Sequence, residues 1–129
     1  MKIKRFNENK ILKESSVVIL NLDNTDKYLF LLRREGWCVP GVKLDEGETH
    51  HDGAIRECFE ETGILPKNLK YLDHKTAVSG RVVHVYSGST TNPNVVISNE
   101  HSDWKWVEQS DISKLKLAGN TGEFLDLLF

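Results

Sequence analysis

Two mainly apolar stretches near the N-terminus predict a pair of β-strands. Residues 15–22 (SSVVILNL) and 27–34 (KYLFLLRR) are rich in β-branched and large apolar side chains, and the polar tetrapeptide DNTD separates them. A short Asn- and Asp-rich segment between two such runs is typical of a turn. Both runs are apolar almost without interruption, which is typical of strands covered on both faces. We therefore expect helices on both sides of these strands.

A helix is predicted after the segment 35–47, which holds three glycines and a proline and reads as a loop with a short strand at 42–44. Thr49 can cap the start of this helix, and Gly63 is placed to end it. The apolar spacing within the helix predicts the side chains that pack on the sheet, namely Ala54, Ile55, Cys58 and Phe59.

The second half of the chain returns to strands and ends in a helical pattern. Two strands, 69–79 and 81–89, flank Gly80, and a further short strand is expected at 103–108. A turn of helix is expected at 111–115 and a terminal helix at 121–129. The pattern predicts a mixed α/β fold in one domain, residues 1–129.

The composition is ordinary for a folded domain, with 39% hydrophobic and 28% charged residues and a net charge of −2. No apolar run approaches the ~18 residues of a membrane span, so no membrane partner is expected. The first ten residues, MKIKRFNENK, lack the apolar core of a signal peptide, which predicts a cytoplasmic protein. The charge balance also argues against a nucleic-acid partner.

The charges are distributed less evenly than their sum suggests. Residues 41–61 contain seven carboxylates against only Lys43 and Arg56. Glu57, Glu60 and Glu61 share one face of the predicted helix, where like charges repel by a few tenths of a kcal/mol per pair, roughly. Hard oxygen ligands without Cys or His favour Mg²⁺ or Mn²⁺, and such an ion would also allow a phosphate-bearing substrate to approach.

The same segment resembles the signature of the MutT/Nudix hydrolase family. That signature runs Gly, five residues, Glu, seven residues, Arg-Glu, apolar, any, Glu-Glu, any, Gly, apolar, and the chain from Val42 to Ile64 matches eight of its nine fixed positions. Val42 stands where the family has the first Gly. The preceding WCVPGVK also resembles the family's approach to this motif. The resemblance implies a Nudix α/β/α sandwich with a loop–helix–loop motif.

The family resemblance also implies a reaction and a set of residues for it. The implied reaction is hydrolysis of a nucleoside diphosphate linked to another group X, by attack of water at phosphorus with Mg²⁺ bound, or with Mn²⁺ as the alternative ion. The implied metal ligands are Glu60 and Glu61, with Glu57 as ligand or general base and the backbone of Gly41. Arg56 is implied to orient these carboxylates, and Glu100 resembles a further ligand or base, although an ordinary loop residue is an equal alternative.

Candidate substrate-binding residues are less specific. Arg33 and Arg34 end a strand near the loop, where a guanidinium could hold phosphate oxygens, and strand alternation lets only one of them face the site. Lys43 could assist electrostatically or remain solvated. Asn120 could read a purine edge through its amide, or it could cap the last helix.

Val42 raises a question about the loop conformation. If the position required a positive φ, a β-branched residue would be strained by about 1 kcal/mol or more. We therefore expect either an extended conformation at Val42 or a modest loss of rate.

The sequence favours an enzyme that converts a (deoxy)nucleoside triphosphate to the monophosphate and pyrophosphate. ADP-ribose or nucleotide-sugar hydrolysis, dinucleoside polyphosphate hydrolysis and RNA 5′ pyrophosphate removal are the alternatives within the family. A domain that senses a nucleotide without cleaving it is the alternative from another class, but such a domain has no need to keep three mutually repulsive carboxylates together. The expected partner is a small nucleotide, and both a monomer and a homodimer stay open.

Overall fold

The computed structural model describes residues 13–129 and has the mixed α/β class that the sequence predicts. The elements are β1 (Glu14–Leu22), β2 (Lys27–Arg33), β3 (Gly36–Cys38), β4 (Gly41–Lys43), α1 (His50–Thr62), β5 (Lys67–Thr76), β6 (Val82–Thr90), β7 (Asp103–Glu108), the 3₁₀ helix η1 (Gln109–Lys114) and α2 (Thr121–Leu125). The N-terminal segment 1–10, on which the expectation of a cytoplasmic protein rests, lies outside the described residues.

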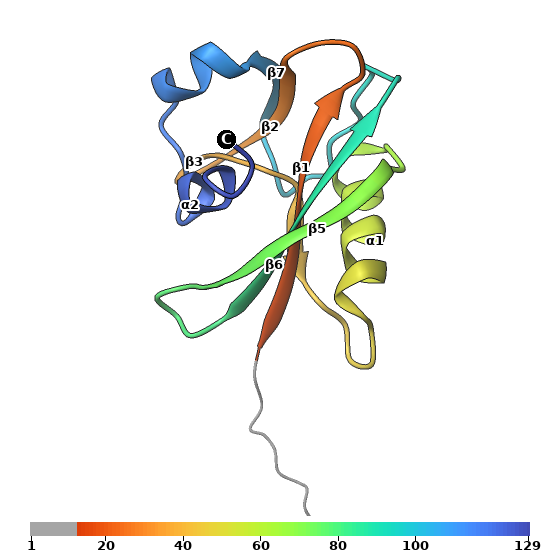
Figure 1. The fold of residues 1–129 in the computed structure, drawn as a ribbon, viewed down its shortest axis with the longest axis vertical. Coiled ribbons are helices and arrows are strands. Elements are labelled where there is room, and N and C mark those ends of the chain that lie inside the picture. The colour runs from red at the N-terminus through yellow and green to blue at the C-terminus, as the bar shows by residue number, and fades with distance from the viewer. Residues whose placement is uncertain (1–12) are drawn as a thin grey trace, which may run out of the picture.

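The seven strands of residues 13–129 form one mixed sheet. Its main path is β3-β2-β1-β6-β5, while β4 pairs with β1 and β7 pairs with β2. The pairing of β1 with β6 is parallel from Glu14↔Val82 to Leu22↔Thr90, and the other pairings are antiparallel. In Figure 1, α1 lies on one side of the sheet, and α2 and η1 lie on the other. The arrangement places β1 at the centre of a layered α/β/α structure.

Alternate residues of β1 enter two separate hydrophobic clusters. Val17 and Ile19 pack in the cluster that contains residues of α2 and η1. Val18 and Leu20 pack in the cluster that contains residues of α1. This confirms that β1 is covered by helices on both faces. Within residues 13–129, no helix is long and apolar enough to cross a membrane.

Helix α1 begins and ends where its capping residues predict. The Thr49 side chain accepts a hydrogen bond of 3.1 Å from the backbone N–H of Asp52. Gly63 adopts a left-handed conformation with φ of 74° and donates its N–H to the carbonyl of Phe59. Left-handed backbone favours glycine, so the helix ends here.

The predicted apolar stripe of α1 is partly wrong. Ala54 and Cys58 are fully buried, but the side chain of Phe59 is 50% exposed. The other buried flank of the helix is formed by Glu57 and Glu61, which turn toward the loop before α1. The buried face of α1 therefore runs between the Ala54/Cys58 side and the Glu57/Glu61 side, and Phe59 lies outside it, toward solvent.

The loop before α1 contains more strand than expected. Three residues, Gly36–Cys38, form β3 against β2, although a segment so rich in Gly and Pro carries no periodic strand signal. Val42 lies in β4, where its backbone pairs with Ser16 of β1. The extended conformation expected at Val42 is therefore present. At the C-terminus, the helix is shorter than predicted and ends at Leu125 rather than at residue 129.

Candidate active site

Gly41 lies where the loop crosses closest to β1. A Cβ atom at this position would collide with the carbonyl oxygen of Ser16 and lie 2.6 Å from the Cα of Val17. Its φ of +154° also disfavours other residues. The backbone N–H of Gly41 donates a 3.0 Å hydrogen bond to Oε1 of Glu61 on α1. Close packing of the loop on β1 thus supplies one hydrogen-bond partner for Glu61.

The most buried acidic groups of the site are Glu57 and Glu61, one helical turn apart. Glu61 is only 2% exposed, and its Oε2 atom has no hydrogen-bond partner within residues 13–129. The pKa of Glu61 is raised to about 8, mainly by burial and also by the nearby charges of Glu57 and Glu100, against the opposing effects of the Gly41 N–H and Arg33. Burial also raises the pKa of Glu57. A buried carboxylate with this environment favours either a proton or a bound cation.

Arg56 lies at the centre of the acidic cluster. Its guanidinium binds Glu48 through two hydrogen bonds, Nε to Oε2 at 2.7 Å and Nη2 to Oε1 at 2.9 Å. The Nη1 atom also contacts Glu57, and it donates to Oε1 of Glu60 at 3.0 Å. The predicted contact between Arg56 and Glu60 is therefore present. The paired guanidinium lowers the pKa of Glu48 to about 2.

Gly53 allows the loop to lie against α1. A Cβ atom at this position would collide with the side chain of Leu44 and lie 3.2 Å from Oε1 of Glu48. The loop 44–48 can therefore approach the helix closely enough for Glu48 to reach Arg56. This accounts for a glycine inside a helix, where it is otherwise unfavourable by roughly 1 kcal/mol relative to Ala.

Four carboxylates line a cavity of about 740 Å³, those of Asp45, Glu57, Glu60 and Glu100. Helix α1, the β2 end, the loop at 98–100 and the start of α2 all contribute to its walls. The cavity brings together seven of the residues predicted from the sequence: Arg33, Gly41, Lys43, Glu57, Glu60, Glu100 and Asn120.

Three predicted residues lie outside the lining of this cavity. Arg56 and Glu61 do not line the cavity, but each is hydrogen-bonded to a residue that does: Arg56 to Glu60 and Glu61 to Gly41. Arg34 instead lines a separate hollow with Trp37, which agrees with the expectation that strand alternation lets only one of the two arginines face the site. A phosphate-binding role for Arg34 in the main cavity therefore has no support from its position.

Asn120 does not cap α2 with its side chain. Its Nδ2 atom donates a 3.1 Å hydrogen bond to Oε1 of Glu123 instead. Asn120 thus occupies the N-cap position of α2 without a side-chain capping bond, and it also lines the cavity, so a role in base recognition stays a prediction.

Arg81 is a cavity residue that sequence reasoning missed. It precedes β6 and lines the cavity with Ser15 of β1, whose Oγ lies 3.5 Å from Nη1 of Arg81. Among the described residues, the cavity lining thus includes three cationic side chains, Arg33, Lys43 and Arg81. A lone Arg after a turn glycine carries no local signal for this role, because only the parallel pairing of β6 with β1 brings it to the site.

The donor chemistry fits a divalent cation, although the carboxylates do not converge in this arrangement. Within the described part of the chain, no three His, Cys, Asp or Glu side chains form a group that could already hold a metal ion. The available donors are nevertheless hard oxygens, the local charge is negative, and Oε2 of Glu61 is buried without a partner. These properties suit Mg²⁺ or Mn²⁺ rather than zinc.

Comparison with known proteins places this arrangement in a family. The model of the NUDIX domain matches residues 12–128. The uncharacterized Nudix hydrolase YvcI of Bacillus subtilis (strain 168) is 32% identical over 119 residues, covering 83% of this chain and 74% of its own. A bis(5′-nucleosyl)-tetraphosphatase [asymmetrical] of Caenorhabditis elegans is 30% identical over 97 residues, covering 69% and 70%.

Solved structures of MutT/nudix proteins have a similar fold. The crystal structure of a MutT/nudix family protein from Enterococcus faecalis superimposes with a TM-score of 0.80 at 17% identity, covering 96% of this chain and 63% of that one. The match of the domain model over nearly the whole chain and the loop–helix site around Arg56 lead to one conclusion: the chain belongs to the Nudix hydrolase family.

Proposed function

We propose that this protein hydrolyses the pyrophosphate bond of a nucleoside diphosphate linked to X, with Mg²⁺ bound, and that X is most often phosphate. A (deoxy)nucleoside triphosphate would then give the monophosphate and pyrophosphate. The observation that carries this proposal is the buried Glu61, whose unpartnered Oε2 lies behind a cavity lined by Glu57, Glu60 and Glu100.

The acidic residues have distinct roles in this proposal. Glu60 and Glu61 are the principal ligands of the cation, and the backbone of Gly41 is a further ligand. Glu57 and Glu100 are the remaining ligands or the general base. The bound ion supplies charge neutralisation and activation of water. Arg56 acts as a positioning residue, because its contacts with Glu48, Glu57 and Glu60 set the orientation of the helix carboxylates.

Other residues of the cavity lining suit a nucleotide. Arg33, Lys43 and Arg81 provide positive charge for phosphate oxygens, while Asn120 provides an amide with both a donor and an acceptor for a purine edge. The similarity to the tetraphosphatase of C. elegans supports dinucleoside polyphosphates as the second candidate substrate class.

A substrate panel with product identification tests this proposal. Purified protein with Mg²⁺ is incubated with nucleoside triphosphates, ADP-ribose, a nucleotide sugar and diadenosine tetraphosphate, and the products are separated by chromatography. We expect a nucleoside monophosphate and pyrophosphate from at least one triphosphate. Binding of a nucleotide without any cleavage across the panel would favour the sensor alternative instead.

Glu61→Gln is the matched variant for the same assay. We expect a loss of turnover of at least about 100-fold, because the variant removes charge from the metal site. We also expect little change in stability, because Gln can still accept from the Gly41 N–H and the buried charge is gone. Near wild-type turnover would show that Glu61 is not a metal ligand.

A further inference from the structure

A thiol and an imidazole from distant parts of the chain meet beside the cavity. Sγ of Cys38 lies 3.9 Å from Nε2 of His101, although 63 positions separate the two residues. Cys38 lines the cavity while being only 6% exposed. The proposed hydrolysis uses neither residue. Sulfur and imidazole nitrogen are softer donors than carboxylate oxygen, so this pair favours other cations than Glu57, Glu60 and Glu61 do.

Both segments that carry the pair are attached to β2 by hydrogen bonds. Cys38 of β3 stands opposite Leu31, and its thiol donates to the Leu31 carbonyl at 3.5 Å. The loop before β7 returns to the same strand, where the backbone N–H of Ser102 donates to the carbonyl of Leu32 at 2.9 Å. One strand therefore holds Cys38 and the neighbour of His101 in place, as a preformed site requires.

The spacing of the pair is close to that of two zinc ligands. A zinc–sulfur bond of about 2.3 Å and a zinc–nitrogen bond of about 2.0 Å, at a tetrahedral angle, place the two ligand atoms about 3.5 Å apart. The observed 3.9 Å exceeds this by a few tenths of an ångström, which small side-chain rotations can close. Nδ1 of His101 is buried without a hydrogen-bond partner within residues 13–129, so no described group holds the ring by its other nitrogen.

The charges around Cys38 favour a bound cation over a free thiolate. The pKa of the thiol is raised to about 11, mainly by burial and also by Glu61 and Glu35, against the opposing effect of Arg33. The thiol therefore keeps its proton at neutral pH and is a poor nucleophile. A thiophilic cation releases that proton to solvent when it binds the sulfur. The same carboxylates that disfavour the thiolate then stabilise the positive ion.

We propose that Cys38 and His101 together bind a thiophilic divalent cation such as Zn²⁺ in the wall of the cavity. Within residues 13–129, no group of three Cys, His, Asp or Glu side chains could hold an ion as placed, so the pair supplies two ligands and water supplies the others. An ion bound to Cys38 lies in the space proposed for the nucleotide. It uses different donor atoms from those proposed for Mg²⁺.

Cobalt titration tests the site, because Co²⁺ bound to a thiolate gives a charge-transfer absorption band that carboxylate and imidazole ligands do not give. Metal-free, reduced protein is titrated first with Co²⁺ and then with Zn²⁺. We expect the band in the wild type, and Zn²⁺ should remove it, because such sites bind Zn²⁺ more tightly than Co²⁺. Cys38→Ser should lack the band. His101→Gln should need at least about tenfold more Co²⁺ to form it, because one ligand is lost.

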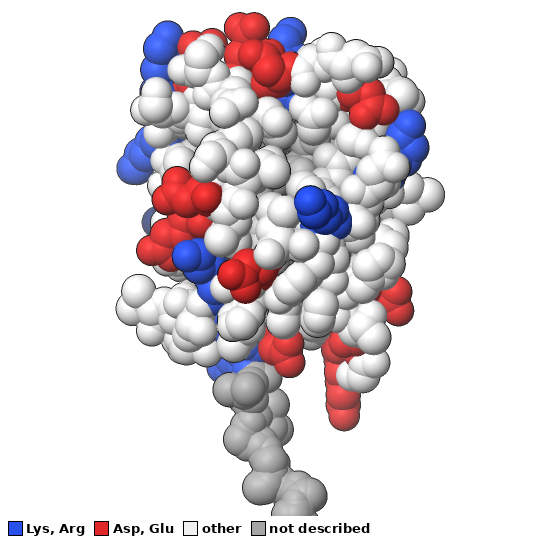
Figure 2. Space-filling model, viewed as in Figure 1, with Lys and Arg blue, Asp and Glu red and all other residues white. Residues whose placement is uncertain are grey.

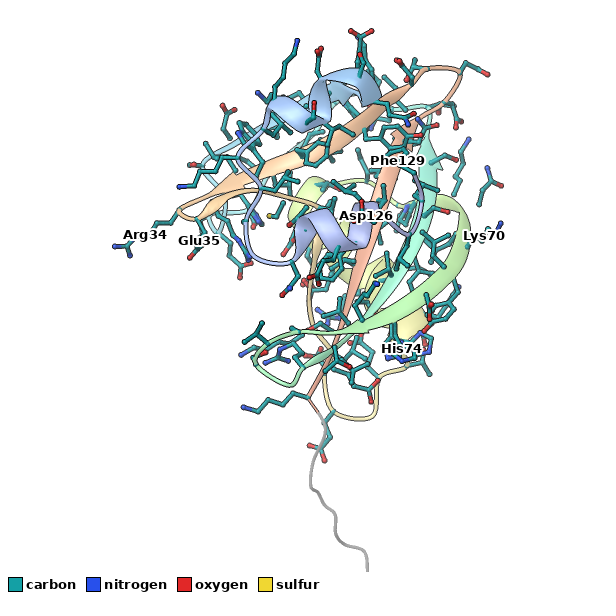
Figure 3. The ribbon with its side chains drawn as sticks, turned by 60° about the vertical axis from the view of Figure 1, so that its left-hand side comes forward. Arg34, Glu35, Lys70, His74, Asp126 and Phe129 are labelled. Carbon is teal, nitrogen blue, oxygen red and sulfur yellow. The ribbon has the colours of Figure 1, made fainter. Side chains whose placement is uncertain are left out.

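Cys58→Ser is the matched control, because Cys58 is the second of the two cysteines, is fully buried and does not line the cavity. His74→Gln is a control for binding at another histidine. Figure 3 shows His74 on the side of the molecule away from Arg34 and Glu35, which mark the turn between β2 and β3. Both variants should keep the wild-type band, and thermal unfolding shows whether each protein is folded.

The sulfur band also separates this site from weak binding at the surface. Figure 2 shows acidic side chains spread among basic ones, and such carboxylates bind Co²⁺ without this band. Absence of the band in the wild type, its persistence in Cys38→Ser or its loss in Cys58→Ser overturns the inference. An unchanged Co²⁺ requirement in His101→Gln also overturns it, because the imidazole is then not a ligand. The assay contains no nucleotide, so its outcome is independent of the proposed hydrolysis.

Discussion

Arg56 reduces the repulsion between the acidic residues of the site, because it forms ion pairs with several of them. Its guanidinium lies within 4.0 Å of four carboxylates, those of Asp45, Glu48, Glu57 and Glu60. The bidentate pair with Glu48 is the best formed of these contacts, and both partners are mostly shielded from solvent. Charge-assisted pairs of this geometry are stronger than ordinary surface ion pairs. Arg56 therefore holds these four carboxylates around one positive charge, while Glu61 forms no ion pair with it.

We predict that Glu48→Gln lowers the free energy of unfolding at pH 7 by about 1 to 3 kcal/mol, because it leaves a partly buried guanidinium without its best partner. The pKa of Glu48 is depressed from 4.5 to about 2 in the folded protein. Its stabilisation is thus fully present above pH 4.5 and is lost as the pH falls through 2. Urea denaturation between pH 7 and pH 3 should show the difference between variant and wild type narrowing with acid.

Glu46→Gln serves as the control for this prediction, because Glu46 is an exposed residue of the same loop. It should leave the unfolding free energy within about 0.5 kcal/mol of the wild type at every pH. A pH-independent loss in Glu48→Gln would show that the ion pair is not the cause.

At the scale of elements, the site depends on the contact of β4 with β1 and α1. Strand β1 pairs with β4 through residues 15–17, and the backbone N–H of Gly41 then reaches α1. The position of the helix carboxylates relative to the loop is therefore determined by one close backbone approach. This is the element contact most sensitive to a single added methyl group.

We predict that Gly41→Ala lowers stability by about 3 kcal/mol or more and removes most activity, because the new Cβ must displace the β1 backbone at Ser16 and Val17. Gly47→Ala is the matched control. Gly47 also has a positive φ, of 77°, but no atom lies within 4 Å of a Cβ placed there. It should lose only about 1 kcal/mol and keep its activity. Thermal unfolding and turnover are measured on both variants, because both carry backbone strain and only Gly41→Ala adds a collision with β1. Equal losses of stability and activity in the two variants would contradict a role for the collision.

At the scale of the whole molecule, a histidine and tyrosine cluster joins α1 to three strands. His50, the first residue of α1, stacks on His84 of β6 at 3.9 Å between ring centres. His50 Nδ1 forms a 2.6 Å hydrogen bond with the hydroxyl of Tyr86, and His84 Nε2 lies 2.6 Å from Glu14 of β1. Tyr71 of β5 also contacts His84 through its hydroxyl, at 3.1 Å. The start of the helix that carries the candidate metal-binding carboxylates is thus connected to the sheet by titratable groups.

We predict that acid weakens this connection. Burial lowers the pKa of His50, and the neighbouring His84 and His51 lower it further against the opposing effect of Glu14. At this one group the unfolded chain therefore binds more protons than the folded protein below about pH 6.5, so the contribution of His50 to stability falls as the pH falls. Glu61, with its raised pKa, acts in the opposite direction in both proteins, so the test is a difference: in urea denaturation from pH 8 to pH 5.5, the stability of the wild type should fall relative to that of His50→Gln. His74→Gln, at an exposed position of β5, should keep the wild-type slope; equal slopes in all three proteins would exclude His50 as the source.

Local signals predicted a large part of this structure. Thr49 and Gly63 mark the bounds of α1 because capping depends on neighbouring residues alone. Strand β3 and the exposure of Phe59 were not predictable in this way. A strand of three residues exists because β2 offers it hydrogen bonds, and the orientation of Phe59 depends on which flank of the helix the loop covers. Arg81 was missed for the same reason, since its role depends on strand pairing.

Residue spacing alone identifies the family motif, because Arg56, Glu57, Glu60 and Glu61 share one side of a helix with 3.6 residues per turn. Which of these charges form ion pairs depends instead on packing between distant segments. Glu48 reaches Arg56 because the loop packs on Gly53, and Glu61 stays unpartnered because burial removes it from water while Gly41 satisfies one oxygen alone. Charges interact through distance and burial, and residues apart in sequence set both.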